Sequence, residues 1–378
     1  MRVLLDCRTT SLTNVGRYTV GLARALGARD DIELVQVGFV GERPPVAPHQ
    51  GARCIFAKKD PFSMAGAREL GHIAASVNAD VLHATHLPTP MPPSHPLVVT
   101  IHDLMPLLVP GSMPSLPQRL AFRYWNGRAA KIADAIIVPS LSTAADVATT
   151  FPIAADKTRV TPEASDEFAA GPMGLLDPAM AEVADWPYLL SMGSTRENKD
   201  LTTLLDAFAR IALARPELRL LLVGADDYPY IHAQMPGVPA AIRDRVVFTG
   251  HVEDPQLRTL FAGAQTFVFP SRHEGFALPP LEAMSFGAPC IVADATSLPE
   301  VVGDAALLFR AGDSGALAAA IERVLTEPEL RDDLSHAGVE RARLFSWAHT
   351  AEATVAVYRE VLGGSSVAAP EPEGDDAP

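Results

Sequence analysis

The 378-residue sequence has little cysteine, and the cysteines it has lack the spacing of a metal or redox site. Cys7, Cys54 and Cys290 lie in apolar, strand-like surroundings and form no CxxC pair. A sparse and odd count is typical of buried thiols in a reducing compartment. It argues against both a zinc site and a disulfide framework.

Long apolar runs are also missing. No stretch approaches the roughly 18 consecutive apolar residues of a membrane-spanning helix. The opening residues, MRVLLD, place an acidic residue after only three apolar ones, which predicts a first strand rather than a signal peptide. We therefore expect a cytoplasmic protein.

The chain has no excess of positive charge, since its formal net charge is −14. Residues 1–180 hold 16 basic and 16 acidic residues, so the whole negative excess lies in the remainder. A strongly acidic second half excludes general nucleic-acid binding. The sequence also has no GxGxxG fingerprint and no internal repeat of fixed period. Its length allows two or three domains, and its 48% hydrophobic content allows a sizeable core.

Apolar, strand-like runs alternate with helical segments through most of the chain, which indicates buried parallel sheets of the α/β class. The expected strands are 2–6, 33–39, 53–56, 80–83, 97–101, 135–138, 158–161, 188–193, 218–224, 245–250, 264–270 and 290–294. The main expected helices are 18–26, 116–133, 201–213 and 345–362. A segment punctuated by proline and glycine, residues 163–187, is expected to link two domains.

Residues 274–282, EGFALPPLE, carry the most chemical information. They follow an expected strand and open a short helix, whose first turn tolerates Pro279 and Pro280 because it needs few N–H donors. The first amides of a helix lack internal partners and carry partial positive charge, so they can bind an anion. The amides expected to do so are those of Phe276, Ala277, Leu278 and Leu281, while Gly275 allows close approach.

Two carboxylates, Glu274 and Glu282, bracket this anion site. Both would repel a lone phosphate. A diphosphate that carries a sugar on each side would fit, because sugar hydroxyls can donate to both carboxylates. The alternative interpretation is a short, well-capped helix with solvated glutamates. The order of strand, loop, Pro-Pro and helix favours the binding site.

Residues 271–309, SRHEGFALPPLEAMSFGAPCIVADATSLPEVVGDAALLF, resemble the paired-glutamate motif of the retaining glycosyltransferases with the GT-B fold, in glycosyltransferase family 4. The resemblance covers nearly all of residues 1–362. It implies that Glu274 contacts the hydroxyls of the donor sugar and that Glu282 holds the ribose of the nucleotide.

The resemblance implies further roles outside this motif. His102, in HDLMPL, would reach the donor sugar near the reacting centre, and Lys199 would pair with the donor diphosphate. The family usually has arginine just before this lysine, where Asn198 stands here, so Arg196 is expected to substitute for it. Gly16, in VGRYT, would lie against the diphosphate and the acceptor, and the backbone at Val252 would meet the base.

Some features have a plainer interpretation. Asp226 and Asp227 are read as a loop, because GT-B enzymes generally need no metal for the diphosphate. The pair of His83 and His86 is poorly spaced for chelation and is read as strand-end and loop histidines. Ser297 to Glu300 fits a capping box. Helix 116–133 carries arginines among aromatic residues, which suits either a lipid interface or an ordinary surface helix.

We therefore expect an α/β protein with the GT-B fold, in which two Rossmann-like domains with doubly wound parallel sheets face a central cleft. Residues 1–170 would form the acceptor-side domain and residues 171–345 the nucleotide-sugar-binding domain. Residues 346–362 would be a helix that packs back on the first domain, and residues 363–378 a disordered acidic tail.

The expected reaction is transfer of a sugar to an acceptor hydroxyl with retention, with no cofactor and no metal. The segments HDLMPL and VGRYT most resemble those of mannosyltransferases that use GDP-mannose in cell-surface polysaccharide assembly. This resemblance implies a sugar or lipid-linked sugar acceptor. UDP-glucose, UDP-N-acetylglucosamine and deoxysugar donors stay open. So do a sugar-nucleotide epimerase, a phosphorylase and a non-catalytic binding protein. Peripheral contact of the N-terminal domain with the inner face of the membrane is a further expectation.

Overall fold

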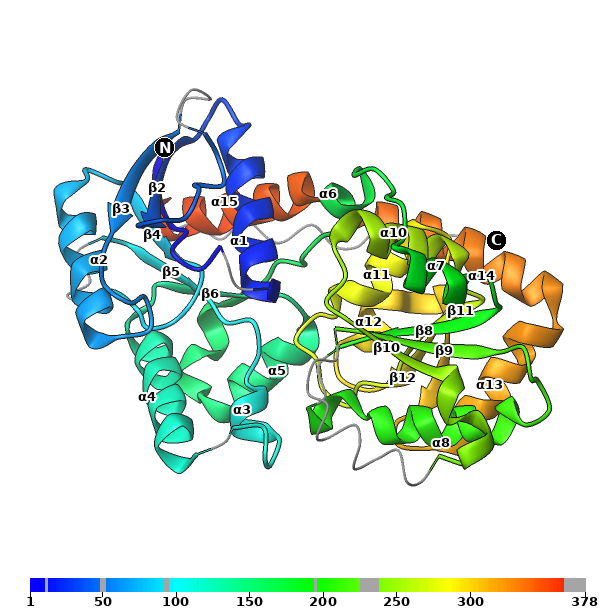
Figure 1. Cartoon of the computed structure of the whole chain (residues 1–378). Helices are drawn as coiled ribbons and strands as arrows, with labels where there is room; N and C mark the ends of the chain where they lie inside the picture. Colours follow the sequence, from blue (N-terminus) through cyan, green and yellow to red (C-terminus); the bar gives the residue numbers. More distant parts are fainter. Residues whose placement is uncertain are drawn as a thin grey trace, which may run out of the picture.

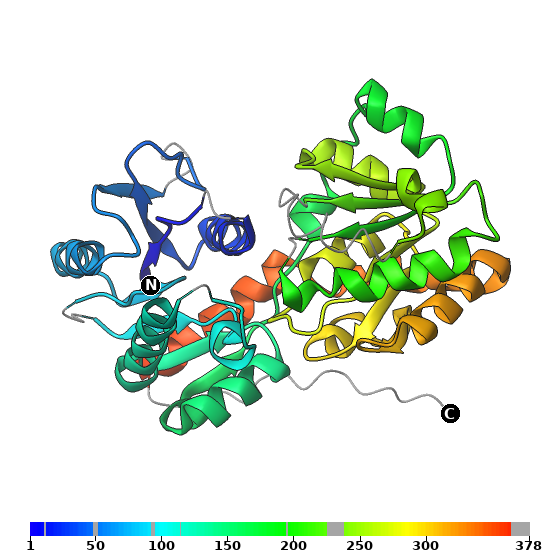
Figure 2. The same ribbon diagram turned by 60° about the horizontal axis from the view of Figure 1, so that its bottom comes forward.

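The computed structural model describes residues 1–10, 13–47, 52–91, 95–113, 115–193, 196–224 and 238–363. These residues form two parallel β-sheets flanked by helices, one sheet from each half of the chain (Figures 1 and 2). The expected α/β fold with two Rossmann-like domains is confirmed. The loop with Asp226 and Asp227 and the tail after residue 363 lie outside the described residues.

The first sheet has seven parallel strands in the order β3-β2-β1-β4-β5-β6-β7. The strands are β1 (Arg2–Asp6), β2 (Glu33–Phe39), β3 (Arg53–Ala57), β4 (Val81–Ala84), β5 (Leu97–Thr100), β6 (Ala135–Val138) and β7 (Thr158–Val160). The helices of this half are α1 (Thr13–Gly27), α2 (Met64–Ser76), α3 (Met105–Leu108), α4 (Leu116–Ile132) and α5 (Leu141–Thr150).

The second sheet has six parallel strands in the order β10-β9-β8-β11-β12-β13. They are β8 (Tyr188–Met192), β9 (Arg219–Val223), β10 (Val246–Gly250), β11 (Thr266–Phe269), β12 (Cys290–Asp294) and β13 (Ala306–Arg310). The remaining helices are α6 (Asp166–Ala169), α7 (Pro178–Ala184), α8 (Leu201–Ala212), α10 (Asp254–Gly263), α11 (Leu278–Ser285), α12 (Leu298–Val302), α13 (Ser314–Thr326), α14 (Pro328–Arg343) and α15 (Trp347–Gly363).

Helices cover both faces of each sheet, which is why the strands read as nearly continuous apolar runs. In β1, Leu4 joins the hydrophobic cluster on one face, while Val3 and Leu5 join the cluster on the other. The predicted strands lie within a residue or two of the observed ones. Strand β13 was not predicted, and α1 begins at Thr13 rather than at residue 18.

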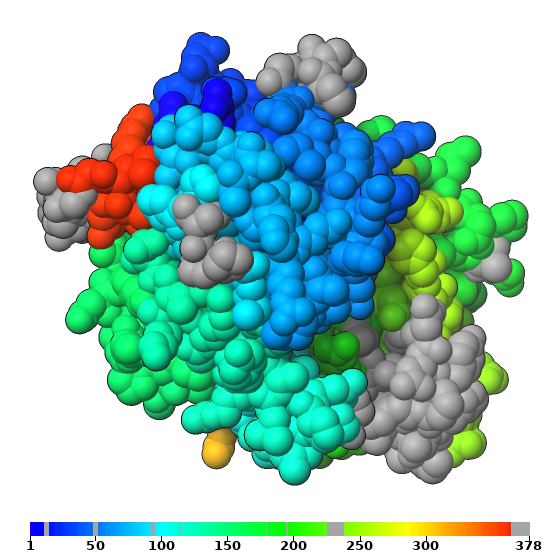
Figure 3. All heavy atoms as spheres, turned by 90° about the vertical axis from the view of Figure 1, so that its left-hand side faces the viewer, coloured from blue at the N-terminus to red at the C-terminus, as the bar shows by residue number. Residues whose placement is uncertain are grey.

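The last helix, α15, returns to the first half of the chain and packs against α1 (Figures 1 and 2). Figure 3 shows its red surface beside the blue and cyan surface of the first sheet's half. The hydroxyl of Tyr358 on α15 lies 2.6 Å from Nδ1 of the buried His83, whose Nε2 lies 2.8 Å from Oγ1 of Thr100. Burial lowers the pKa of His83 to about 3, so the ring is neutral. Helix α15 therefore completes the core of the first half.

Gly21 makes the close packing of α1 on α15 possible. A Cβ atom at this position would lie 2.1 Å from Cε2 of the buried Trp347. We expect Gly21→Ala to lower the free energy of unfolding by about 1–3 kcal/mol through overpacking. Denaturant titration measures this, with Gly363→Ala as the control because a Cβ there meets nothing within 4 Å. Equal stability of the two variants would contradict the tight α1–α15 contact.

Candidate active site

A cleft of about 490 Å³ opens at the carboxyl ends of the second sheet's strands. The strand order reverses between β8 and β11, and this is where open α/β sheets bind ligands. Residues from both halves line the cleft, including Arg17 and Asp103 from the first half and Lys199, Glu274 and Glu282 from the second. The structure therefore brings the two predicted glutamates and the predicted lysine into one cavity.

The loop between β11 and α11 forms the floor of the cleft. Ala277 has a positive φ of 85° and caps α11, whose first turn holds the two prolines. Among the described residues, the amides of Phe276, Ala277 and Leu278 donate to no backbone carbonyl. Leu278 lines the cleft. The predicted cluster of unpaired amides is thus present at the start of this helix.

Glu274 and Lys199 form an ion pair within the cleft. The Nζ atom of Lys199 lies 2.6 Å from Oε1 of Glu274, which also accepts a hydrogen bond from the hydroxyl of Ser271. The same ammonium lies 5.2 Å from the centroid of the Phe269 ring, within cation–π range. Both charged side chains are mostly buried. The cation and the carboxylate are therefore held in fixed positions before any ligand binds.

Hydrogen bonds join the loop that carries Lys199 to the loop that carries Glu274. The carbonyl of Asn198 accepts from the amide of Arg272 at 2.7 Å and from the hydroxyl of Ser271 at 2.9 Å. Its side-chain amide donates to the carbonyl of His273 at 3.2 Å. Both Asn198 and Arg196 line the cleft, but Asn198 is buried and committed to these bonds, whereas Arg196 is exposed.

Glu282 lies in α11 and is almost completely buried. Arg17, on α1 of the first half, donates from Nη1 to Oε1 of Glu282 and from Nη2 to Oδ1 of Asp254 at 2.7 Å. Burial, with a smaller contribution from the carboxylate of Asp254, raises the pKa of Glu282 to about 6 against the opposing effect of Arg17. Arg17 was not among the predicted site residues, because nothing in the local sequence pattern relates α1 to α11.

His102 does not line this cleft. Its Nδ1 lies 3.1 Å from Oε1 of the buried Glu163, and its Nε2 lies 3.0 Å from the carbonyl oxygen of Thr85. Both neighbours are acceptors when Glu163 is ionised, so the ring satisfies both by carrying two protons. Although burial alone would lower it, the pKa of His102 is raised, because Glu163 and Thr85 both accept hydrogen bonds from the ring. To reach a sugar with a ring nitrogen, His102 would have to release one of these partners.

Of the other predicted site residues, some line the cleft and some do not. Val252 is buried and lines the cleft. Gly16 does not line this cleft but lines a second hollow of about 290 Å³, which Arg17 and Glu282 also line. A Cβ on Gly16 would lie 2.5 Å from the carbonyl oxygen of Thr10, so close packing requires glycine there. Gly193 and Gly224, which follow β8 and β9 and line the cleft, were missed, although glycine directly after a strand is a usable signal.

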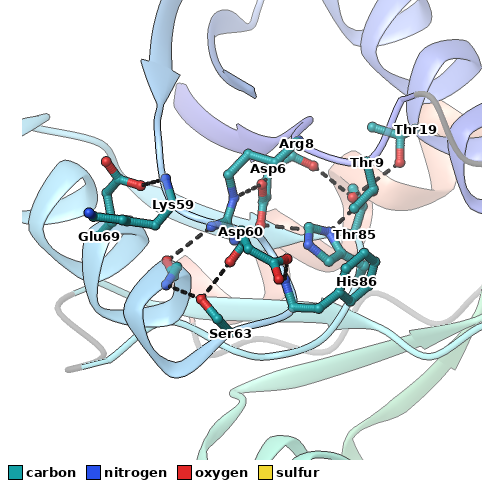
Figure 4. A network of polar contacts seen from close by, with 12 residues as sticks. Asp6, Arg8, Thr9, Thr19, Lys59, Asp60, Ser63, Glu69, Thr85 and His86 are labelled. Carbon is teal, nitrogen blue, oxygen red and sulfur yellow. Dashed lines mark hydrogen bonds and ion pairs between the residues drawn. The ribbon is translucent and has the colours of Figure 1, made fainter. Parts of the chain in front are cut away.

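The strand order of the first sheet reverses between β1 and β4, but side chains fill this point (Figure 4). The fully buried Arg8 donates from Nε and Nη2 to the two carboxylate oxygens of Asp6, at 2.8 and 2.7 Å, and from Nη1 to the carbonyl of Gly66 at 2.9 Å. His86 lies beside them, with Nδ1 3.7 Å from Asp6, and burial lowers its pKa to about 4. This network anchors the loop that leads to α1.

The expected capping box at Ser297 and Glu300 is wrong. The hydroxyl of Ser297 donates to the carbonyls of Glu274 and Phe276, both at 3.1 Å, and makes no cap hydrogen bond. The carboxylate of Glu300 accepts from the amide of Leu141, at the start of α5 in the other half, at 2.8 Å. Because an unpaired helix amide from another domain was available, the carboxylate bonded there instead of to its own helix.

Metal ligands do not gather in the part of the chain that the structure describes. It contains no group of three or more His, Cys, Asp and Glu side chains placed to hold an ion. The expectation that the reaction needs no metal stays a prediction. The same residues include no helix that is both long enough and apolar enough to cross a bilayer.

Two facing Rossmann-like domains, with paired glutamates and a lysine in the cleft between them, define a glycosyltransferase of the GT-B type. Comparison with family models agrees: residues 15–166 match Glycosyltransferase Family 4, and residues 186–327 match Glycosyl transferases group 1. The chain belongs to glycosyltransferase family 4.

Known proteins similar to this chain are also glycosyltransferases. It is 28% identical over 375 residues to the O-antigen chain mannosyltransferase B of Escherichia coli, covering 92% of this chain and 96% of that protein. It is 31% identical over 288 residues to the alpha-maltose-1-phosphate synthase of Mycolicibacterium smegmatis, covering 70% and 73%. The solved sucrose-phosphate synthase of Thermosynechococcus elongatus has a TM-score of 0.76 and 22% identity, covering 97% and 100%, which concerns the fold.

The burial of Glu282 predicts a stability cost. Because its pKa of about 6 in the folded chain exceeds the ordinary 4.5, the folded state holds this proton more tightly than the unfolded state. Stability therefore falls as pH rises from below 4.5 to above 6, by about 2 kcal/mol. We expect Glu282→Gln to recover most of this above pH 7 and to gain little at pH 4.5, as measured by denaturant unfolding at both pH values. A smaller gain in stability over wild type at pH 8 than at pH 4.5 would contradict this expectation.

Proposed function

We propose that the protein is a retaining glycosyltransferase that moves mannose from GDP-mannose to an acceptor hydroxyl in polysaccharide or glycolipid assembly. The observation that carries the proposal is the grouping, in one cleft, of the Glu274–Lys199 pair, of Leu278 with its unpaired amide at the start of α11, and of the buried Glu282. Each group fits one part of a nucleotide sugar.

In this proposal the diphosphate lies between Lys199 and the amides of residues 276–278, with Arg196 at the open side. Catalysis comes mainly from stabilising the diphosphate as it leaves, because negative charge accumulates on it while the glycosidic bond breaks. The glycines at 193 and 224 leave room for the phosphates beside the strand ends. The ribose hydroxyls donate to Glu282, and the base lies near Val252.

The carboxylate of Glu274 then faces the transferred sugar. It orients the sugar hydroxyls and stabilises the positive charge that the ring gains as it becomes oxocarbenium-like. We assign no covalent nucleophile. The acceptor hydroxyl attacks from the face that the diphosphate leaves, and the leaving phosphate takes the acceptor's proton, so the anomeric configuration is retained.

Mannose is the preferred donor sugar because the full-length relative in Escherichia coli is named as a mannosyltransferase of the O-antigen chain. The similarity to a maltose-1-phosphate synthase is what keeps glucose donors as the alternative. No divalent metal is required, since cationic side chains and helix amides meet the diphosphate.

Helix α4 supports a further part of the proposal, peripheral contact with an anionic membrane. Leu116, Leu120 and Tyr124 recur at four-residue spacing and are each more than half exposed, with Arg119 and Arg123 among them. Residues 104–133 contain four basic residues and no acidic residue, within a chain of net charge −14. An apolar stripe flanked by cations suits a surface of anionic lipid.

The sugar-facing role of Glu274 predicts a split between binding and turnover. Glu274→Gln keeps the size and an acceptor oxygen but removes the charge, so we expect kcat to fall about 10²–10³-fold while the Kd of GDP is nearly unchanged. Calorimetry with GDP, UDP and dTDP, followed by product analysis with GDP-mannose and its UDP-linked competitors, measures both quantities on one preparation.

Ser285→Ala, a change on α11 away from the cleft lining, serves as the control. Near-normal turnover of Glu274→Gln, or loss of nucleotide affinity in step with turnover, would mean that this carboxylate does not face the sugar. Inversion at the anomeric carbon, or activity that EDTA abolishes and magnesium restores, would contradict the proposed mechanism.

The α4 surface predicts binding to vesicles. We expect the wild-type protein to sediment with phosphatidylglycerol vesicles and not with phosphatidylcholine vesicles, because cations and an apolar stripe must act together. Leu120→Glu should abolish the binding, whereas Leu213→Glu, at an exposed leucine beside α8, should not. Unchanged sedimentation of Leu120→Glu would place the lipid contact elsewhere or nowhere.

A further inference from the structure

We infer that Arg17 is a positioning residue for the nucleotide, so that the donor site is completed across the domain boundary by a side chain from the first domain. The inference rests on the proposed function, in which Glu282 receives the ribose. Arg17 fixes one oxygen of Glu282 and leaves the other for the ligand.

The contacts of Arg17 are specific. One guanidinium edge meets Oε1 of Glu282, the other meets Oδ1 of Asp254, and the Arg17 Cζ atom lies 5.1 Å from the centroid of the Phe168 ring. Two nitrogens and two carboxylates set the plane of the guanidinium, and the ring supports its face. Arg17 also lines both the donor cleft and the second hollow, together with its two carboxylate partners Glu282 and Asp254.

Charge explains why this arrangement matters. A buried carboxylate without a cation neutralises itself by taking up a proton. Three charged groups act on Glu282: Arg17 from α1, and Asp254 and Arg258 from α10. Asp254 opposes ionisation. The guanidinium of Arg258 donates to the carbonyls of Phe168 and Pro172, so it is committed to another contact. Arg17 is therefore the cation that keeps Glu282 in the state that accepts two ribose hydroxyls.

The first domain holds Arg17 in place through its own anchors. The buried Asp6–Arg8 pair fixes the loop after β1, and Gly16 packs on the carbonyl of Thr10 within that loop. Two residues after Arg17 on α1, the hydroxyl of Thr19 donates to that of Thr85 at 3.1 Å. Separation of the domains would take the guanidinium away from Glu282. The nucleotide should therefore bind the closed arrangement more tightly than the open one.

The experiment is calorimetry with GDP at pH 6 and pH 8 on four variants and the wild type. Arg17→Met should weaken binding at pH 6 by about tenfold or more, as for loss of a charged hydrogen bond. The loss should be smaller at pH 8, because the higher pH opposes the protonation of Glu282 that follows when its cation is removed. The titration of GDP itself affects the Kd of every variant equally. A difference in pH dependence between a variant and wild type therefore reports the protonation of Glu282. Arg17→Lys keeps the positive charge but loses the forked guanidinium that bonds both carboxylates. At pH 6 it should bind GDP more tightly than Arg17→Met and more weakly than wild type.

Arg24→Met is the matched control, because Arg24 lies two turns along α1, is exposed and pairs with Glu167. Its Kd should equal that of wild type at both pH values. The fourth variant, Glu282→Gln, separates the two levels of the argument. If it weakens GDP while Arg17→Met keeps the wild-type Kd and pH dependence, the inference is wrong and the ribose assignment stands. If Glu282→Gln itself binds GDP normally, the ribose assignment fails, and the role of Arg17 fails with it.

Discussion

The ionised carboxylate of Glu282, buried where the two domains meet, is the constraint on which the arrangement of the cleft depends. Such a group is stable only with a cation, and the cation comes from α1 of the other domain. The position of α1 depends in turn on the loop after β1. The buried Asp6–Arg8 pair fixes this loop at the carboxyl end of β1. A local motif in one domain thus requires a particular placement of the other.

The two sheets use the same topology differently. At the reversal point of the first sheet, the guanidinium of Arg8 and the ring of His86 occupy the space that a ligand would need. At the reversal point of the second sheet, glycines follow β8 and β9 and the space stays open. The filled reversal point of the first sheet makes that domain a rigid support, whereas the open one of the second sheet leaves room for a ligand. The proposed donor site therefore lies mainly in the second domain, and the first domain contributes Arg17 to it.

The fold and half of the candidate site could be predicted from the sequence because their signals are local. Apolar runs of strand length located all but one strand, and the segment 274–282 located the glutamates, the amides and the prolines. The partners across the chain could not be predicted. Arg17 and Glu282 are 265 residues apart, Leu141 and Glu300 are 159 apart, and His102 and Glu163 are 61 apart. Spacing cannot reveal such pairs, because only the packed domains bring them together. Ser297 and Glu300 fit a local capping pattern, but the carboxylate of Glu300 instead accepts from the amide of Leu141 in the other domain. The local sequence could not reveal this partner.

The return of α15 to the first sheet has a consequence for the order in which the chain can fold. His83 is buried against Tyr358, which follows it by 275 residues, and Val3 and Leu5 share a cluster with Trp347 and Val355. During synthesis, the first domain emerges from the ribosome long before these partners exist. It must wait with an open apolar face and an unpaired histidine while the second domain is made. Only after residues 347–363 have been released can the first domain reach its final packing, so the first domain, although made first, is completed after the second domain has been made.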